Sequence, residues 1–161
     1  MRSILWNGLL VFLSYYANNL VHEMGHLVTG RLFGLPMHKV FIALSPARSQ
    51  PAQPTFSLFG VAFYIGISSL VSFAPVNEYR LKRATPRARF CMNLAGPLCG
   101  ALFAIGWILF FWNWTQGIIG ALWVLIHLEN LQPKSPEQGG PNDGYGVAEA
   151  WREIKVAKAN P

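Results

Sequence analysis

Charge is what this chain lacks most. Of its 161 residues only 12% are charged and 52% are hydrophobic, whereas an ordinary soluble domain carries about 25% charged residues. The mean hydropathy is +0.30. This shortage of charge excludes an ordinary soluble domain and indicates an integral membrane protein, in which roughly 20 apolar residues make one span. We expect one membrane domain over residues 1–161, with three or four spans and no appended soluble domain.

Acidic residues and cysteines are also scarce. Seven Asp and Glu stand against 13 Lys and Arg, which gives a formal net charge of +6. Such an excess suggests nucleic-acid binding in a soluble protein, but here the basic residues cluster beside apolar runs, where they bind anionic lipid head groups. We therefore expect a lipid bilayer, and no nucleic acid, as a partner. The two cysteines, Cys91 and Cys99, lie in one apolar segment and are interpreted as helix-packing residues and not as a disulfide.

The N-terminus lacks the cleavage site of a secretory signal peptide. Arg2 precedes an apolar stretch and Ala17 could end it, but no A-x-A-like site is present. We predict instead one long helix over residues 4–33, which the stop signals Gly34-Leu35-Pro36 terminate.

Two more helices are expected in the second long apolar tract. The polar turn from Trp112 to Gly117 contains two tryptophans and interrupts this tract as an interfacial aromatic belt would. We therefore predict spans at 90–111 and 117–130. Over residues 145–159, apolar residues at helical spacing alternate with Lys and Arg, which predicts an amphipathic helix on the cytoplasmic membrane surface or a solvated C-terminal helix.

The segment 56–74 carries no charge in nineteen residues and is the hardest to place. Its aromatic and β-branched content, with glycines spaced through it, suits strands and turns better than a helix. Basic residues between Arg80 and Arg89 precede the second helix, and Arg31 and Lys39 follow the first, so both ends should face the cytoplasm. They can share one side only if an even number of crossings lies between them. We choose no crossing, and thus a membrane-associated β-hairpin or re-entrant element, over two short crossings; this puts the N-terminus outside.

The most informative motif is His22-Glu23-Met24-Gly25-His26, inside an apolar stretch. On a helix, His22 and His26 project from one face, so two imidazoles can bind one zinc ion. Glu23 follows a ligand directly, and its carboxylate can accept a proton from water held at the zinc, which makes H-E-x-x-H typical of hydrolases. A membrane helix is a costly place for such residues unless they have a function. The motif therefore predicts a catalytic zinc site.

Catalytic zinc sites usually have three protein ligands, and the residues alone leave the third one open. The candidates are His38, His127, Glu129, Glu137 and Asp143. His38 lies beyond a helix break and is expected at the membrane interface, whereas the third span returns residues 127–143 to the side of His22. Asp143 lies in a turn-forming stretch that can direct a carboxylate into a cavity, although a solvated turn is the simpler interpretation.

Two groups of small or uncharged polar residues receive simple interpretations. Gly96 and Gly100 give the second helix a small-residue face, for which close helix contact is a sufficient explanation. Asn18 and Asn19 precede His22 by one turn, and they either orient its ring or bond to a neighbouring helix.

Taken together, the motifs resemble those of the site-2 proteases, which are intramembrane zinc metalloproteases. That family combines an H-E-x-x-H helix, commonly with Gly at the fourth position, with a later A-G-P, an N-x-x-P and a D-G. This chain has, in the same order, His22-Glu23-Met24-Gly25-His26, Ala95-Gly96-Pro97, Asn130-Leu131-Gln132-Pro133 and Asp143-Gly144. Val40 to Pro46 also looks like the family's strand after the first catalytic helix. The resemblance covers roughly residues 15–146.

By this resemblance, His22, His26 and Asp143 would ligate Zn²⁺, Glu23 would be the general base, and Asn130 would place substrate or orient the site. The fold implied is mainly α and polytopic, with a core of three transmembrane helices and the small β element. The activity implied is hydrolysis of peptide bonds of membrane proteins in or near the bilayer, by a multi-pass protein of the cell membrane.

Two features set this chain apart from the common members of that family. The interval between Pro133 and Asp143 is longer and more polar, and no PDZ-like insertion is present. The alternative function is that of a catalytically inactive membrane adaptor or scaffold that keeps zinc as a structural clamp. Glu23 discriminates between the two functions, because a structural site has no need of an acid beside the ligand.

Overall fold

The protein consists of four helices and three short strands over the residues that the computed structural model describes, which are 2–35, 37–43, 53–66, 84–111, 113–134 and 142–159. The elements are α1 (Arg2–Leu32), β1 (Lys39–Ala43), β2 (Phe56–Leu58), β3 (Val61–Gly66), α3 (Pro86–Phe110), α4 (Trp114–Asn130) and α5 (Asp143–Ala159).

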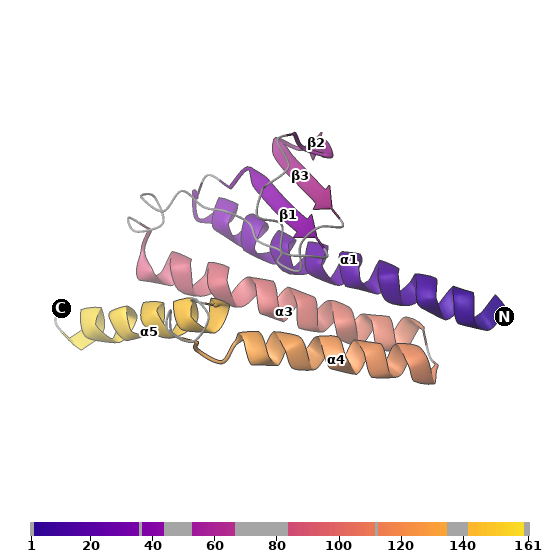
Figure 1. The fold of residues 1–161 in the computed structure, drawn as a ribbon. Helices are drawn as coiled ribbons and strands as arrows, with labels where there is room; N and C mark the ends of the chain where they lie inside the picture. Colours follow the sequence, from indigo (N-terminus) through magenta and orange to yellow (C-terminus); the bar gives the residue numbers. More distant parts are fainter. Residues whose placement is uncertain are drawn as a thin grey trace.

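Helices α1, α3 and α4 form a layered bundle, in which α3 runs antiparallel to both neighbours (Figure 1). The C-terminal end of α1, the start of α3 and the end of α4 consequently lie at the same end of the bundle. Helix α5 continues from α4 at that end and lies against the first part of α3 (Figure 1). The small sheet lies on the opposite side of α1 from α4. This arrangement brings the H-E-x-x-H motif near the end of α1 close to the D-G motif at the start of α5.

The three long helices occur where the sequence predicts them, with ends that differ by a few residues. Helix α3 begins at Pro86, before the predicted residue 90, because Thr85 caps it: the Thr85 side chain accepts a hydrogen bond from the Ala88 N–H at 3.2 Å. Of the described helices, α3 alone is long and apolar enough, by length and composition, to cross a membrane. The three-span core therefore stays a prediction, although the helices themselves are present.

The sheet has the strand order β1-β3-β2, with β1 parallel and β2 antiparallel to β3. Strands β2 and β3 confirm the predicted hairpin for residues 56–66, and the remainder of the segment 56–74 lies outside the described residues. Phe59 and Gly60 form the hairpin turn with φ of 49° and 70°, as two-residue hairpin turns require. The Arg31 guanidinium donates to both of their carbonyls at 3.1 and 3.2 Å, which ties the hairpin to the end of α1.

Strand β1 extends the hairpin into a three-stranded sheet. It confirms residues 40–43 of the strand expected over Val40 to Pro46, the rest of which lies outside the described residues. One side of the sheet packs on α1 to form an apolar core, whose buried residues are Leu27, Leu35, Met37, Val40, Ile42, Val61, Phe63 and Met92.

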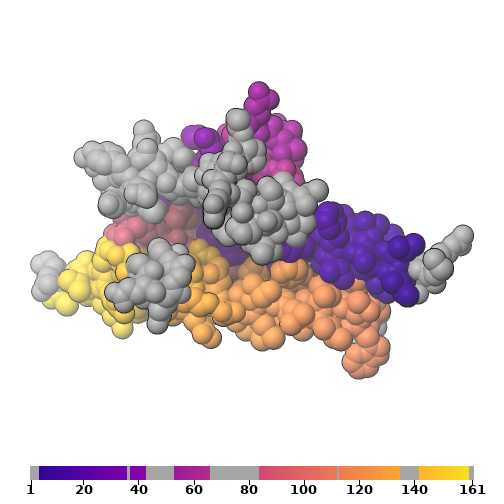
Figure 2. Space-filling model, viewed as in Figure 1, coloured from indigo at the N-terminus to yellow at the C-terminus, as the bar shows by residue number. Residues whose placement is uncertain are grey.

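The bundle itself is apolar outside and polar inside. Large hydrophobic side chains are exposed along the outward faces of α1, α3 and α4, for example Phe12, Leu102 and Leu125. On the face shown in Figure 2, the N-terminal half of α1 and the length of α4 form one continuous part of the surface. The buried polar side chains of the described residues are Ser14, Asn18, His22, Glu23, His26, Gln116 and His127. Such an inversion is expected where lipid is the surrounding solvent and polar side chains face the bundle interior.

Candidate metal centre

Helix α1 presents its motif toward α3, and the fourth motif residue makes this approach possible. His22, Glu23 and His26 are all buried, with at most 8% of the residue exposed. A Cβ on Gly25 would lie 2.6 Å from the Ala95 carbonyl oxygen. The two helices can therefore approach this closely only because position 25 has no side chain.

Asp143 reaches the two histidines from the start of α5. Its Oδ2 lies 3.2 Å from Nε2 of His22, and its Oδ1 lies 3.3 Å from Nε2 of His26. Asn142 caps the helix, because its Oδ1 accepts a hydrogen bond from the Tyr145 N–H at 3.0 Å. Asp143 thus occupies a helix N-terminus in the structure, in place of the solvated turn that was the simpler interpretation.

The three side chains fit a tetrahedral metal ion. The Nε2 atoms of His22 and His26 are 3.1 Å apart, and ligand atoms from all three residues lie within 4.8 Å of one another. Bonds of about 2.0–2.1 Å at tetrahedral angles place ligand atoms about 3.3 Å apart, close to these separations. Two imidazoles and a carboxylate are also a donor set that zinc prefers in catalytic sites. The group could therefore hold zinc.

Electrostatics keep the Asp143 carboxyl ionised. Burial by itself would raise its pKa, but hydrogen bonds and charge interactions with His22 and His26 outweigh burial and hold the pKa well below the usual range for aspartate. An ionised carboxylate is the form that ligates a metal, so no proton has to leave Asp143 at neutral pH.

The ring of His26 is oriented by α3. Its Nδ1 donates a hydrogen bond to the Met92 carbonyl at 2.8 Å, which leaves Nε2 as the nitrogen directed at His22 and Asp143. Gly96 provides the space for this ring, since a Cβ there would lie 2.2 Å from Nε2. Gly100, one turn later, does the same for His127, at 2.3 Å from the ring. The sequence interpretation explained these glycines by close helix contact alone. That explanation is therefore not sufficient, because both glycines also make room for imidazole rings.

Glu23 lies beside the group and is not one of its three members. Its Oε1 is 3.9 Å from Nε2 of His22, and the residue is 2% exposed. A carboxylate at this distance can reach a molecule held between the ligand atoms without being a ligand itself.

Asn130 contacts the same carboxylate from the end of α4. Its Nδ2 donates to Oδ2 of Asp143 at 2.6 Å. Asn130 was expected either to place substrate or to orient the site. This contact fits the second role, because it holds the Asp143 oxygen that faces His22.

The other candidate ligands lie elsewhere. Glu129 is exposed and binds Lys134 at 2.6 Å, and His38 is exposed beside Arg31. Glu137 lies outside the described residues. His127 is buried next to His22, but the two rings meet through their Nδ1 atoms at 3.3 Å. The sequence interpretation considered His127 only as a ligand and did not predict this contact.

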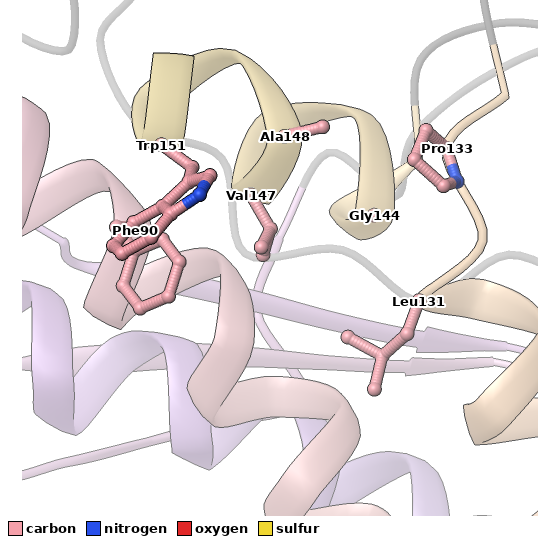
Figure 3. A pocket seen from close by; sticks show the side chains of 7 residues that line it. All are labelled: Phe90, Leu131, Pro133, Gly144, Val147, Ala148 and Trp151. Atoms are coloured by element: carbon pink, nitrogen blue, oxygen red, sulfur yellow. The ribbon is translucent and has the colours of Figure 1, made fainter. Parts of the chain in front are cut away.

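An apolar pocket adjoins the site through Gly144. It has a volume of about 260 Å³ and lies between α5, the start of α3 and the segment after α4. Trp151 and Phe90 lie against each other on one side of it, and Leu131 and Pro133 lie toward the other (Figure 3). The pocket therefore offers an apolar surface beside Gly144, the residue that follows Asp143 in the chain.

Fold and site together place a group that could hold a metal ion, with a carboxylate beside it, inside the helix bundle. The model of Peptidase family M50 matches residues 10–156, and the chain therefore belongs to this family, the site-2 protease family. Membership implies a membrane-embedded metalloprotease function, and metalloproteases of this family depend on zinc in general. No curated protein matches the chain.

Proposed function

We propose that this protein is an intramembrane zinc-dependent endopeptidase that hydrolyses peptide bonds of membrane proteins in or near the bilayer. The observation that carries the proposal is the trio of ligand atoms of His22, His26 and Asp143 within 4.8 Å, with the buried Glu23 carboxylate beside it. A purely structural metal site has no use for that additional carboxylate, whereas hydrolysis needs a base there.

Each residue of the centre has a defined part in this proposal. His22, His26 and Asp143 hold the metal, and Asn130 holds the Asp143 carboxylate in place. The chemistry that bound zinc supplies is Lewis acidity, which polarises the scissile carbonyl and acidifies water. Glu23 accepts the proton of the attacking water and returns it to the leaving amine. The surrounding apolar helices exclude bulk water, which strengthens these interactions.

We further propose that α1, α3 and α4 all cross the membrane of the cell. The apolar exterior and polar interior of the bundle support this arrangement. Helix α4, with 17 residues, is at the lower limit of about 17–25 residues for a span. The sheet would lie against the membrane, and α5, which carries Lys and Arg beside Trp151, would lie on its cytoplasmic surface.

The apolar pocket beside the centre supports a substrate that enters from the membrane. Its lining contains the side chains of Phe90, Leu131, Val147 and Trp151. An apolar side chain next to the scissile bond would bury hydrophobic surface there, as those of transmembrane segments can.

Two substitutions separate the roles of the centre. In Glu23→Gln, we expect one zinc per chain to remain while cleavage is abolished, because the amide keeps the shape but cannot accept the proton. In Asp143→Ala, we expect zinc content and activity to fall together. Glu129→Gln is the control, since Glu129 is exposed and bound to Lys134. Zinc content by metal analysis and membrane fragments by proteomics are the measurements.

The same variants distinguish an enzyme from an adaptor. If wild-type protein with full zinc cleaves no membrane substrate and Glu23→Gln cells show the wild-type phenotype, the protein is a zinc-containing adaptor. If Asp143→Ala keeps its zinc and Glu129→Gln loses it, the assignment of the third ligand is wrong.

Cysteine labelling tests the orientation in the membrane. Thr85 and Thr115 are exposed at opposite ends of α3 and α4, and basic residues cluster only near Thr85. With Cys91 and Cys99 replaced, Thr115→Cys should react with an impermeant reagent in intact cells and Thr85→Cys should not. The reverse labelling pattern would contradict the proposed orientation. It would also contradict the assignment of no membrane crossing to the segment 56–74, which depends on that orientation.

A further inference from the structure

His22 lies at one end of a buried chain of polar groups that runs from α1 to α4 and back to α1. Its Nδ1 is 3.3 Å from Nδ1 of His127, and the two ring planes are inclined by 17° with centroids 5.1 Å apart. Nε2 of His127 is 2.8 Å from Nδ2 of Asn18, one turn before His22 on α1. All three residues are buried, with exposed fractions of 7%, 4% and 1%. The chain joins the metal centre to the interior of the bundle.

Metal binding decides where the protons of this chain lie. Nε2 of His22 faces the other ligand atoms, at 3.1 Å from His26 and 3.2 Å from Asp143. To ligate through Nε2, a neutral His22 must carry its proton on Nδ1. That N–H points to Nδ1 of His127, which must then accept the hydrogen bond and carry its own proton on Nε2.

Asn18 can supply the hydrogen-bond acceptor that the Nε2–H of His127 needs. Its Nδ2 is directed at His127, while its Oδ1 is buried and has no hydrogen-bond partner among the described residues. A half-turn of the amide directs Oδ1 at Nε2–H of His127, which gives this proton an acceptor. The outer partners of metal-bound histidines are usually carboxylates, carbonyls or water, whereas here a second imidazole takes that place.

We propose that His127 and Asn18 are positioning residues that set the tautomer of His22 through a relay of neutral groups. In the relay, Nδ1–H of His22 donates to His127, and Nε2–H of His127 donates to Oδ1 of Asn18. Without metal, the same chain runs in the opposite direction: Asn18 donates to His127, His127 to His22, and Nε2–H of His22 to Asp143. Loading with zinc reverses the chain without a change in its charge.

Two further contacts help to test the relay: one makes room for the ring of His127, and the other joins the same helices without belonging to the relay. Gly100 seats the ring of His127, because a Cβ there would lie 2.3 Å from it. One turn earlier, a second, partly buried hydrogen bond joins the same two helices, from Nε1 of Trp123 to Oγ of Ser14 at 3.3 Å. Ser14 precedes Asn18, and Trp123 precedes His127, by one helical turn. This second pair links α1 and α4 in the same way but does not reach the metal centre.

The proposal rests on the zinc centre proposed above, and zinc affinity of the full-length protein tests it. We expect His127→Leu to weaken zinc binding by about 10–100-fold, the usual cost of losing an outer-shell partner. Asn18→Leu should weaken it less, and the double variant should be no worse than His127→Leu, because both act through one chain. Ser14→Ala and Trp123→Phe are the matched controls and should bind zinc as the wild type does. Chelator competition gives the dissociation constants.

Nitrogen-15 spectra of histidine-labelled wild-type protein provide a test that needs no variant. With zinc bound, His22 should be protonated at Nδ1 and metal-bound at Nε2, and His127 should be protonated at Nε2 without metal. Metal on His127, a proton on its Nδ1, additive losses in the double variant, or unchanged affinity in His127→Leu would each overturn the relay while leaving the zinc centre intact. Wild-type protein that binds no zinc would overturn the proposed function and the relay together.

Discussion

Helix α1 has an interior on each of two sides, and the two are built differently. Toward the sheet, Leu27 packs with apolar residues such as Val40, Ile42 and Phe63, all at most 5% exposed. Toward α3 and α4, α1 buries the polar side chains of Ser14, Asn18, His22, Glu23 and His26, with Leu10 beside them. One side resembles the core of a soluble domain, whereas the other is built mainly around buried polar side chains.

The difference lies in what each interior requires of its residues. Hydrophobic burial is non-directional, so the sheet side needs the right volumes and few specific partners. A buried polar group needs a partner at hydrogen-bonding distance, and a lost partner costs more than the bond contributes. Errors in the first interior should therefore lower stability, whereas errors in the second should alter the metal site.

The largest effect is expected at the glycine that seats a ligand. In Gly96→Ala, the new Cβ would lie 2.2 Å from Nε2 of His26, and we expect zinc affinity to fall by about 100-fold or more because one of three ligands is displaced. Gly106→Ala is the control on the same helix, since nothing lies within 4 Å of its position. Zinc titration of the purified proteins measures both. Equal affinities in the two variants would show that His26 is not confined by α3.

An effect of another kind, on stability and not on the metal site, is expected on the sheet side. Ile42 is 1% exposed and Ile65, its partner in register on β3, is 38% exposed. We expect Ile42→Ala to lower the free energy of unfolding by about 2–5 kcal/mol, Ile65→Ala to cost clearly less, and both folded proteins to keep wild-type zinc affinity. Thermal unfolding in detergent and zinc titration are the measurements. A loss of zinc affinity in folded Ile42→Ala would contradict the separation of the two interiors.

The smallest effect is expected at the ion pair that joins α3 to α5. Arg89 of α3 binds Glu153 of α5, and the Glu153 side chain is 42% exposed. Because solvent screens such a pair, we expect Arg89→Ala to cost about 1 kcal/mol or less, with a few-fold loss of zinc affinity because α5 carries Asp143. Lys134→Ala removes the exposed pair with Glu129 and should change neither quantity. If the two variants behave alike, Arg89 does not help to hold α5.

Local patterns made much of this molecule predictable. The apolar runs, the stop signals after Phe33 and the polar turn from Trp112 to Gly117 placed the helices within a few residues, since helix formation depends on short-range hydrogen bonds and on hydrophobic faces. The aromatic and β-branched content of the segment 56–74, with glycines spaced through it, favoured strands and turns, and residues 56–66 form the hairpin. The partner of β1 was not predictable, because a parallel pairing depends on how the chain returns and not on the strand's own residues.

The site divides in the same way. Spacing along one helix is enough to place His22, Glu23 and His26 together, because four residues make about one turn. Their relation to Asp143 depends on α4 returning beside α1 and on Asn142 starting a new helix. The turn-forming stretch around Asp143 made it a candidate, but a solvated turn explained the same residues equally well, and the family resemblance was needed to assign it as a ligand.

By itself, the sequence determined the apolar character of this protein, its main helices and the paired histidines with their neighbouring acid, because composition and helical periodicity are properties of short segments. Tertiary structure alone decided that Asp143 lies 3.2 and 3.3 Å from the two histidines, that Gly96 and Gly100 seat imidazole rings, and that His127 lies behind His22. These contacts join residues far apart in the chain. Their geometry is set by the close approach of whole helices, for which no segment carries the information alone.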